Sequence, residues 1–271
     1  MNVGGVLAAS GIEPREARLL LAEACGFSEA SVLAHPEREL PAAVEARFRA
    51  MAARRRAGEP IGYIVGRKEF YGLPLTVGPA VLIPRPETEL LVELALERLP
   101  ADADAAAVDL GTGCGAIALA LKRNRSRTRV LAVEQSAAAL EFARRNAAKL
   151  GIEIEIRHGR WFGPLAGEKF DVVVSNPPYV AAGDPHLEQG DVRFEPRAAL
   201  VAGEDGLDAI REIVRAAPAH LEPGGWLLLE HGVGQEHAAR GLLEAAGLVR
   251  IFTAPDLAGV ARVTGGTLKS D

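Results

Sequence analysis

The chain has 271 residues, enough for one large domain or, more typically, two. Its 48% hydrophobic and 25% charged residues are ordinary for a globular protein that folds in water. The net charge of -5 argues against gripping duplex nucleic acid through many phosphates, since proteins that do so carry a basic surface.

Cysteine usage and hydropathy predict a reduced setting without a membrane anchor. Cys25 and Cys114 are far apart in the sequence, and the six histidines form no cluster with them, so we expect neither a disulfide framework nor a metal site. No run of 18 apolar residues is present, and the N-terminus lacks the features of a signal peptide. We therefore expect a cytoplasmic protein.

Residues 1–66 have a helical pattern throughout and are predicted to form a small N-terminal bundle that recognises a partner. Pro14 and Gly26 suit the start and the stop of one helix, and Ser28 suits the cap of the next. The predicted helices cover 15–24, 28–33 and 41–56.

The third of these helices ends on Arg54, Arg55 and Arg56. Cations complement the negative end of a helix dipole, so the run is interpreted first as a solvated helix end. A contact surface for an acidic partner or for RNA is the alternative.

Residues 67–83 are predicted to be a β-hairpin linker, because the segment 69–77 has strand character and is followed by Gly78 and Pro79. The domain predicted over 84–271 opens with a helix that has Pro86 in its first turn. Glu87 and Glu89 suit the positive end of this helix.

From about residue 105 strands alternate with helices, which predicts a mostly parallel, doubly wound α/β sheet. The predicted strands cover 108–110, 129–133, 152–157, 170–175, 226–230, 248–253 and 260–264, and the helices between them cover 116–122, 136–150, 207–217 and 235–246. Ligands of such sheets bind beyond the carboxyl ends of the strands.

A glycine-rich turn, Asp109–Gly115, follows the first of these strands. Glycines let a backbone turn tightly and approach a ligand closely. The turn matches neither the dinucleotide fingerprint nor the Walker loop, so alone it is a weak signal. Glu134, about 20 residues further on at the next strand end, can accept from both hydroxyls of a ribose. Together they indicate a nucleoside-bearing cofactor.

The strand over 170–175 is followed by Asn176, Pro177, Pro178 and Tyr179. The prolines stiffen the bend, and Asn176 is held extended because it precedes one. The Asn176 side-chain oxygen and the Pro177 carbonyl can then accept from one –NH2 group, with the Tyr179 ring against its face. A simple strand-ending turn would need only one proline and no aromatic residue.

These features predict methyl transfer from S-adenosylmethionine to a planar amino group. Two acceptors would aim the nitrogen lone pair at the methyl group, and the proton of the alkylated nitrogen can leave to water without a dedicated base. Adenine N6, cytosine N4 and a glutamine amide all remain open on this chemistry.

The motifs together resemble the HemK/PrmC family, the peptide chain release factor glutamine N5-methyltransferases. The resemblance covers nearly the whole chain and is carried by the segments Ile83–Glu89, Asp109–Gly115, Ser175–Tyr179 and Gly190–Pro196. It implies a class I (Rossmann-like) methyltransferase fold with a seven-stranded sheet. The implied substrate is the glutamine in the GGQ motif of class 1 release factors, so that the enzyme tunes translation termination.

The resemblance also assigns residues. It places S-adenosylmethionine against Gly111, Thr112, Gly113, Cys114, Gly115, Glu134, Trp161 and Asn176. It places the substrate glutamine against Asn176, Pro177, Pro178 and Tyr179, with Asn176, Pro177 and Tyr179 as the catalytic residues. Arg85, Glu87 and Glu195 also match family positions, with either a functional or a structural role.

Two positions depart from the family pattern. Glu134 stands where Asp is more usual, and its longer arm should still reach the ribose. Arg160 precedes Trp161 where the family often has Asp, so backbone groups and Trp161 are left to hold the adenine.

Three alternatives stay open. A glutamine of a ribosomal protein, methylated by a sister family, is the nearest. An adenine-N6 methyltransferase acting on DNA would need a recognition domain for which the chain has little room. A catalytically silent binding module is disfavoured by the intact motifs. We expect a monomer that needs neither nucleic acid nor a membrane.

Overall fold

The computed structural model describes residues 1–102 and 104–270. The chain divides into two compact units, one formed by Met1–Arg67 with His186–Phe194 and the other by Lys68–Pro185 with Glu195–Asp271. The sequence had placed 186–194 in a long loop of the second domain, whereas its contacts join it to the helical unit.

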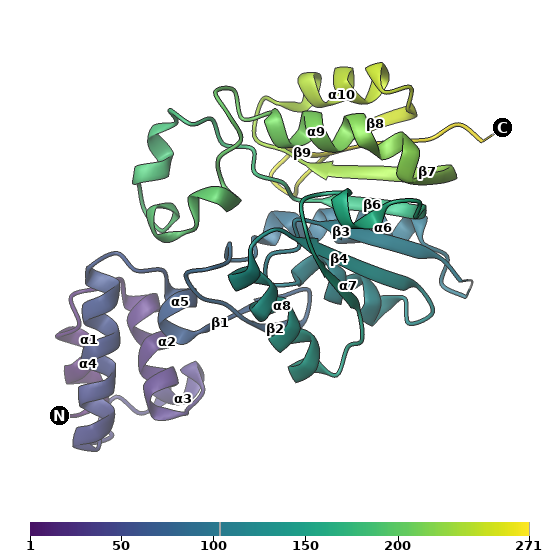
Figure 1. Ribbon diagram of the computed structural model, residues 1–271. Helices are drawn as coiled ribbons and strands as arrows, with labels where there is room; N and C mark the ends of the chain where they lie inside the picture. The colour runs from purple at the N-terminus through teal and green to yellow at the C-terminus, as the bar shows by residue number, and fades with distance from the viewer. Residues whose placement is uncertain (103, 271) are drawn as a thin grey trace. The chain divides into compact units, whose positions relative to one another are not determined.

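The first unit is helical, as the sequence predicts, and α2 and α3 have the predicted capping residues. Its helices are α1 Val3–Ala8, α2 Pro14–Cys25, α3 Glu29–Ala34, α4 Ala42–Arg56 and α5 Ile61–Val65 (Figure 1). Gly26 ends α2 in the left-handed conformation, and the Ser28 hydroxyl accepts from the Ser31 amide at the start of α3. Leu20, Leu21 and Phe48 are buried in its core.

The three arginines at the end of α4 all have partners inside this unit. Arg54 donates to Glu59, and Arg56 donates to the Ser10 carbonyl oxygen. Arg55 lies 2.8 Å from both a Glu16 and an Asp191 carboxylate oxygen, which ties α4 to α2 and to the 186–194 segment. These contacts favour a structural role for the run over a free basic surface.

The predicted hairpin is present as β1 Arg67–Phe70 and β2 Leu73–Thr76. The buried Asn146 side chain attaches β2 to the rest of the second unit: it accepts from the Thr76 amide and donates to the carbonyl oxygens of Thr76 and Cys114. One side chain thus joins the hairpin to the glycine-rich turn.

The second unit is built on the predicted seven-stranded sheet, in the order β5-β4-β3-β6-β7-β9-β8. Its strands are β3 Ala106–Leu110, β4 Arg129–Glu134, β5 Glu155–His158, β6 Phe170–Ser175, β7 Leu221–Glu230, β8 Val249–Pro255 and β9 Ala261–Thr267. The strands from β5 to β7 are parallel, while β9 runs antiparallel to both of its neighbours.

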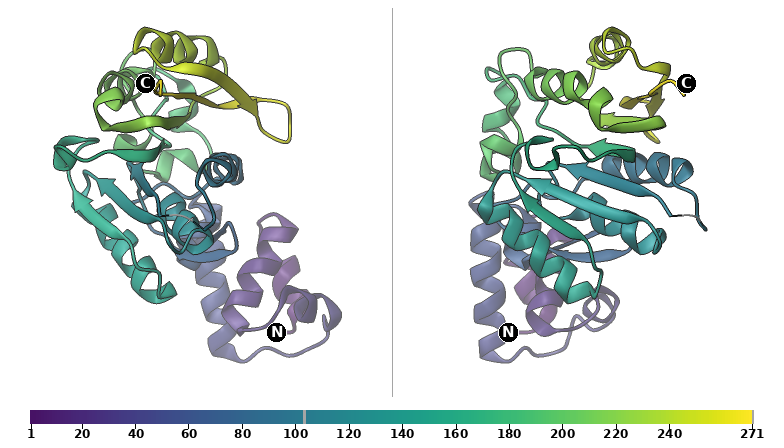
Figure 2. Two further views of the ribbon diagram at one scale, coloured as in Figure 1. Left: turned by 90° about the vertical axis from the view of Figure 1, so that its right-hand side faces the viewer. Right: turned by 45° about the vertical axis from the view of Figure 1, so that its right-hand side comes forward.

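Helices cover both faces of this sheet (Figure 2). They are α6 Glu89–Arg98, preceded by the turn η1 Pro86–Thr88, then α7 Ala116–Asn124, α8 Ala137–Leu150, α9 Asp208–Ala216 and α10 Glu236–Ala245. Val108 and Leu110 of β3 join one buried cluster with Ile210 and Ile213 of α9 and Leu243 of α10. Alternate residues point to the opposite face, as strand geometry requires.

The starts of two strands differ by three or more residues from the sequence prediction. The third strand begins at Glu155 and not at Ile152, because the Ile152 amide donates to the Ala147 carbonyl oxygen and completes the end of α8. The fifth begins earlier, at Leu221, which pairs with Phe170 ahead of an irregularity in the ladder. The carboxyl ends of β3 and β6 lie where the sequence predicts them, at Leu110 and Ser175.

The strand order defines where a ligand binds. The chain builds outward from β3 through β4 to β5, then returns to place β6 on the other side of β3. The ends of β3 and β6 therefore flank the switch point, the usual ligand site of such sheets. The Ser175 hydroxyl donates to the Leu110 carbonyl oxygen at 2.6 Å and holds these ends together.

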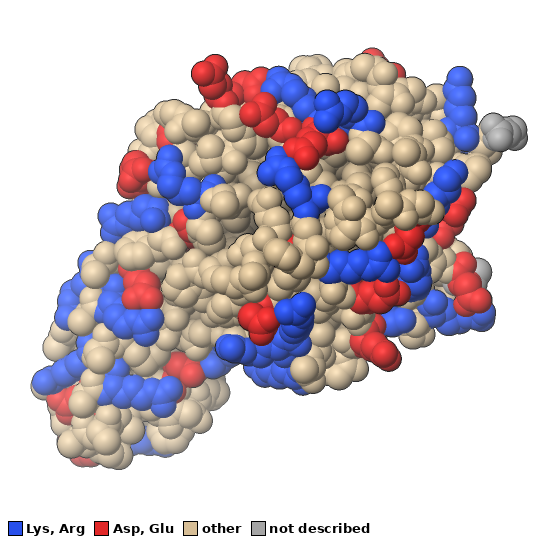
Figure 3. All heavy atoms as spheres, in the orientation of Figure 1, with Lys and Arg blue, Asp and Glu red and all other residues tan. Residues whose placement is uncertain are grey.

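No helix within residues 1–102 and 104–270 combines the length and the apolarity that crossing a bilayer requires. Positive and negative side chains are interspersed over the face shown in Figure 3.

Candidate active site

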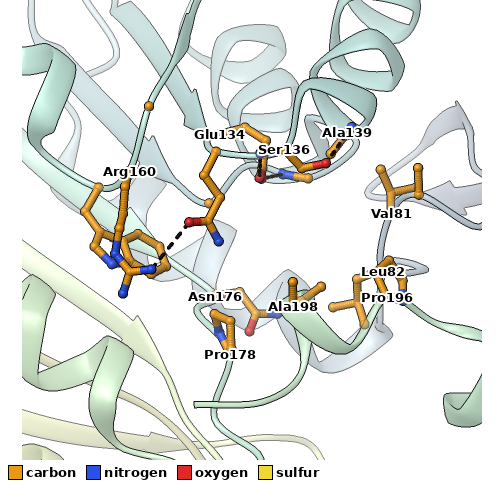
Figure 4. A pocket seen from close by; sticks show the side chains of 17 residues that line it. Val81, Leu82, Glu134, Ser136, Ala139, Arg160, Asn176, Pro178, Pro196 and Ala198 are labelled. Carbon is orange, nitrogen blue, oxygen red and sulfur yellow. Dashed lines mark hydrogen bonds between the residues drawn. The ribbon is translucent and has the colours of Figure 1, made fainter. Parts of the chain in front are cut away.

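A cavity of about 370 Å³ opens at the switch point of the sheet. Predicted site residues on its wall are Gly111, Gly113, Glu134, Trp161, Asn176 and Pro178. In Figure 4, Glu134 with Ser136 and Asn176 with Pro178 lie on different sides of the open space. The two halves of the site that the sequence predicts thus share one cavity.

The glycine-rich turn contributes backbone to the cavity and turns its side chains inward. The three glycines Gly111, Gly113 and Gly115 all have positive φ, at 78°, 58° and 87°. The Thr112 hydroxyl donates to Asp109 at 2.6 Å, and Cys114 is buried. Thr112, Cys114 and Gly115 are absent from the cavity wall and shape the turn from behind.

Asp109 anchors this turn from inside the protein. Its Oδ2 accepts from the Thr112 hydroxyl and from the Ala118 amide. Burial raises the pKa of Asp109 to about 7, and these two hydrogen bonds offset part of the effect. Asp109 is therefore a structural carboxyl group that titrates near neutral pH.

The Glu134 carboxylate is fixed by two backbone amides. Its Oε2 accepts from Gly113 at 3.0 Å, and its Oε1 accepts from Ser136 at 2.8 Å. Ser136 is the N-cap of α8, so the carboxylate also lies at the positive end of that helix. Each carboxylate oxygen can accept more than one hydrogen bond, which leaves capacity for ligand hydroxyls on the cavity side.

Trp161 forms an apolar wall against the glycine-rich turn. It is only 7% exposed and has a φ of 45°, a strained value for a residue other than glycine. A Cβ atom placed on Gly111 would lie 3.1 Å from the Trp161 ring. This position therefore needs glycine for two reasons, the left-handed backbone and the close approach of the indole.

Arg160, next to Trp161, is engaged by acidic and amide side chains. Its guanidinium group donates to both oxygens of Glu212, lies 3.4 Å from Gln135 Oε1 and sits 5.6 Å from the Trp161 ring centroid. Figure 4 draws this contact as a dashed line from Arg160, and Arg160 and Gln135 both line the cavity. Arg160 thus supports the indole wall from the outside.

Asn176 presents an open hydrogen-bond acceptor. Its Nδ2 donates to the Thr88 hydroxyl oxygen at 3.0 Å. Its Oδ1 is buried and has no hydrogen-bond partner among the described residues. An unpartnered buried carbonyl costs free energy on the order of 1–3 kcal/mol unless a ligand satisfies it. The amide therefore offers an acceptor to whatever group enters the cavity.

The other residues of the Asn-Pro-Pro-Tyr segment either line the cavity or hold the segment in place from behind. Pro178 lines the cavity, whereas Pro177 and Tyr179 do not. The Tyr179 hydroxyl donates to Glu230 at 3.3 Å, and its carbonyl oxygen accepts from Gln235 at 3.0 Å. Burial raises the pKa of Tyr179 above its usual range, so its hydroxyl stays a donor.

Arg85 and Glu195, which also match positions of the family motifs, form an ion pair. The buried Glu195 carboxylate accepts from the Ile83 amide and from the Arg85 guanidinium group. Pro196, Ala198 and Ala199 follow directly and line the cavity. The pair thus connects the approach to α6 with one wall of the site.

Three polar side chains that support the site were assigned no role from the sequence: Thr88, Asn146 and Glu230. Thr88 lies inside a quoted motif, and Glu230 ends a predicted strand at the ligand edge, so both carried a weak signal. Asn146 lies mid-helix, after two arginines and before two alanines, and gave none. Their partners are distant in sequence, by 88 residues for Thr88 and Asn176.

The fold matches solved methyltransferases. The Thermus thermophilus 16S rRNA N2 G1207 methyltransferase, solved with AdoMet and guanosine, aligns with a TM-score of 0.57 at 24% identity over 75% of this chain and 50% of that one. A methyltransferase from Pyrococcus furiosus aligns with a TM-score of 0.56 at 18% identity over 80% of this chain and 97% of that one. Sheet order, glycine-rich turn and site position define a class I methyltransferase fold.

Sequence comparison narrows this class. The Methyltransferase small domain model matches residues 88–191, and the PrmC N-terminal domain model matches residues 5–66. The release factor glutamine methyltransferase of Pseudomonas aeruginosa is 51% identical over 93% of this chain and 91% of its own length. That of Burkholderia pseudomallei is 49% identical over 97% and 95%. The chain belongs to the release factor glutamine methyltransferase family, as the motifs predict.

Proposed function

We propose that this protein transfers the methyl group of S-adenosylmethionine to the side-chain amide nitrogen, N5, of a glutamine in a peptide chain release factor. The observation that carries the proposal is the buried, unpartnered Asn176 Oδ1 on the wall of a cavity shared with Glu134 and Trp161. The names of the full-length relatives support the release factor as substrate.

The cavity has the features that a nucleoside-bearing methyl donor requires. Glu134 is held where it can accept from ribose hydroxyls, and glycine backbone with a tryptophan face borders the same space. Gly111, Gly113, Glu134 and Trp161 would hold the donor, with Thr112, Cys114 and Gly115 shaping the turn. When bound, S-adenosylmethionine supplies an electrophilic methyl group on a sulfonium.

The task of the substrate half is to orient a weak nucleophile. An amide lone pair is conjugated, and breaking that conjugation fully would cost roughly 18–20 kcal/mol. Asn176 Oδ1 would accept from one N–H bond of the substrate amide so that the lone pair is directed at the donor. The Pro177 carbonyl, which the sequence suggested as a second acceptor, does not line the cavity. Orientation of this kind is worth about 7–11 kcal/mol. The Pro178 ring limits the space around the amide.

Proton removal needs no dedicated base in this scheme. The amide nitrogen becomes acidic as it is alkylated, and its proton can leave to water. Asn176 therefore acts as an orienting acceptor. Tyr179 supports the segment through Glu230 and Gln235.

Further parts of the proposal concern the partner and the setting. We infer that the target is the glutamine of the GGQ motif in class 1 release factors and that residues 1–66 recognise this substrate. We further infer that the enzyme acts as a cytoplasmic monomer without a nucleic-acid requirement, so that it tunes translation termination.

Methyl transfer from labelled S-adenosylmethionine to three acceptors tests the function: a class 1 release factor, ribosomal proteins and DNA. Label in the release factor, lost when its GGQ glutamine is replaced, is the expected result. Label in ribosomal protein or DNA with none in the release factor would overturn the proposal.

A further inference from the structure

We propose that Gln235 is a positioning residue for methyl transfer, whose side-chain amide fastens the Asn-Pro-Pro-Tyr segment and the loop at Asp205 to the end of β7. This inference deepens the proposed function and rests on it. Gln235 does not line the cavity, so it acts through the segments that it holds.

The Gln235 amide is bonded to main-chain groups at both of its ends. Its Oε1 accepts from the Gly232 amide at 2.9 Å, two residues beyond the end of β7. Its Nε2 donates to the Tyr179 carbonyl oxygen at 3.0 Å and to the Asp205 carbonyl oxygen at 3.3 Å. Reversing the amide would set its –NH2 group against an N–H group and its oxygen against two carbonyl oxygens. The side chain therefore joins three stretches of chain in one orientation.

Two of these stretches form the substrate half of the site. Directly after the Asn-Pro-Pro-Tyr segment, the Val180 amide donates to the Leu200 carbonyl oxygen, and the Val180 carbonyl oxygen accepts from the Ala202 amide. This parallel bridge aligns the segment with the stretch that begins at Pro196 and Ala198 on the cavity wall. The Gln235 amide holds the same two stretches together at a second point.

Glycines let the main chain close around this amide. Gly206 has a φ of 76°, and a Cβ atom placed on it would collide with the Tyr179 carbonyl oxygen and lie 2.8 Å from Gln235 Nε2. A Cβ atom on Gly232 would lie 3.1 Å from Gln235 Oε1 and 3.3 Å from the Tyr179 ring. Both ends of the amide are thus packed tightly, which fixes the Tyr179 main chain as well as its hydrogen bond.

The position of Tyr179 reaches the reacting group through a stiff connection. Pro177 and Pro178 have fixed φ angles, so a shift of the Tyr179 main chain is carried back to Asn176, which has the open acceptor. Orientation of a reacting group loses much of its value when the geometry shifts by about 1 Å. Gln235 should therefore affect kcat, while the half of the site assigned to the cofactor is unchanged.

The test compares Gln235→Met and Gln235→Glu with the wild type. It measures kcat and KM for the release factor at saturating S-adenosylmethionine, and cofactor affinity by calorimetry. Methionine has a similar length but none of the hydrogen bonds, so kcat should fall about tenfold. Glutamate keeps the acceptor for Gly232 but turns a carboxylate toward two carbonyl oxygens, so kcat should fall at least as far. Cofactor affinity should stay within about twofold. Glu244→Met, on an exposed residue of α10, is the matched control.

Gly206→Ala tests the same junction with Gln235 in place. Its new Cβ atom would push the Tyr179 carbonyl oxygen away from the amide, and kcat should again fall about tenfold or more. Gly247→Ala is the control, because its φ is similar, at 80°, and nothing lies within 4 Å of the new Cβ. The two variants share the backbone strain and differ in the contact with Tyr179.

A role limited to the start of α10 needs only the Gly232 contact, which Gln235→Glu retains. Gln235→Glu with the kcat of the wild type would therefore overturn the inference, as would a loss confined to cofactor affinity. If neither Gln235 variant folds, equal kcat in Gly206→Ala and Gly247→Ala has the same consequence. A wild type that does not label the release factor contradicts the proposed function instead, so the two failures are distinguishable.

Discussion

The turn after β3 and the segment after β6 border one cavity but treat their polar groups in opposite ways. In the turn, Thr112 is bonded to Asp109, and both Glu134 oxygens accept from backbone amides. After β6, the Asn176 amide is bonded on one side only, and its oxygen is left without a partner. In the first region, hydrogen bonds within the protein already fix these polar groups in place, which suits tight cofactor binding. The second keeps an acceptor open and suits the orientation of a reacting group.

The largest effect should come from removing the open acceptor. Asn176→Ala is expected to lower kcat about 100-fold or more, the scale seen when one preorganised hydrogen-bonding group is lost from an active site. Cofactor affinity, measured by calorimetry, should change little because the glycine-rich turn and Glu134 are intact. Asn124→Ala, on an exposed residue at the end of α7, is the control. Weak cofactor binding with normal turnover would reverse the assigned roles.

The converse change removes the Glu134 carboxylate, which is fixed by two backbone amides beside the glycine-rich turn. Glu134→Ala removes a charged acceptor of ligand hydroxyls and frees two backbone amides, so affinity for S-adenosylmethionine should fall roughly 100-fold. At saturating cofactor, kcat should stay within severalfold of the wild type. Glu141→Ala, on the exposed face of α8, controls for the loss of a carboxylate. Unchanged affinity in Glu134→Ala would place the donor elsewhere.

A smaller effect should follow from adding one methyl group beside Trp161. Gly111→Ala meets a left-handed backbone and the indole at 3.1 Å, and should lower cofactor affinity about tenfold as the wall shifts. Gly167→Ala has a similar φ, 77°, with nothing within 4 Å of the new Cβ. Both variants should lose about 1–2 kcal/mol in urea unfolding, since the backbone penalty is shared. Equal affinities in the two would remove the role of the Trp161 contact.

The mildest prediction concerns Asp109 and pH. Its folded pKa of about 7 lies above the unfolded value near 3.8, so the native state binds the proton more tightly and loses stability as pH rises between these values. Asp109→Asn cannot ionise. Its unfolding free energy relative to wild type should therefore increase from pH 4 to pH 7. Asp104→Asn, at a highly exposed carboxylate, should show no such trend.

Local patterns at strand ends were enough to locate the cavity from the sequence. Gly111, Gly113, Glu134 and Asn176 each follow or end a strand, and parallel strands bring those ends to one edge of the sheet. The pattern also predicted the sheet and the caps of α2 and α3. These features depend on residues that are close together along the chain, so they can be recognised in a single sequence.

Long-range pairing limited what the sequence revealed. Asn146 contacts Thr76 across 70 residues, and Arg55 contacts Asp191 across 136. The same limit hid the distinction between Thr112 and Cys114, which turn inward, and Gly111 and Gly113, which line the cavity. No periodicity encodes which of several polar groups meet after folding.

The most direct measurement is mass spectrometry of a release factor incubated with S-adenosylmethionine and either wild-type enzyme or Asn176→Ala, with fragmentation to locate the added methyl group. The wild type should add one methyl group to the side-chain nitrogen of the GGQ glutamine, and the variant should add almost none while still binding the cofactor. A methyl group on another residue, or equal methylation by Asn176→Ala, would contradict the role of the open Asn176 oxygen.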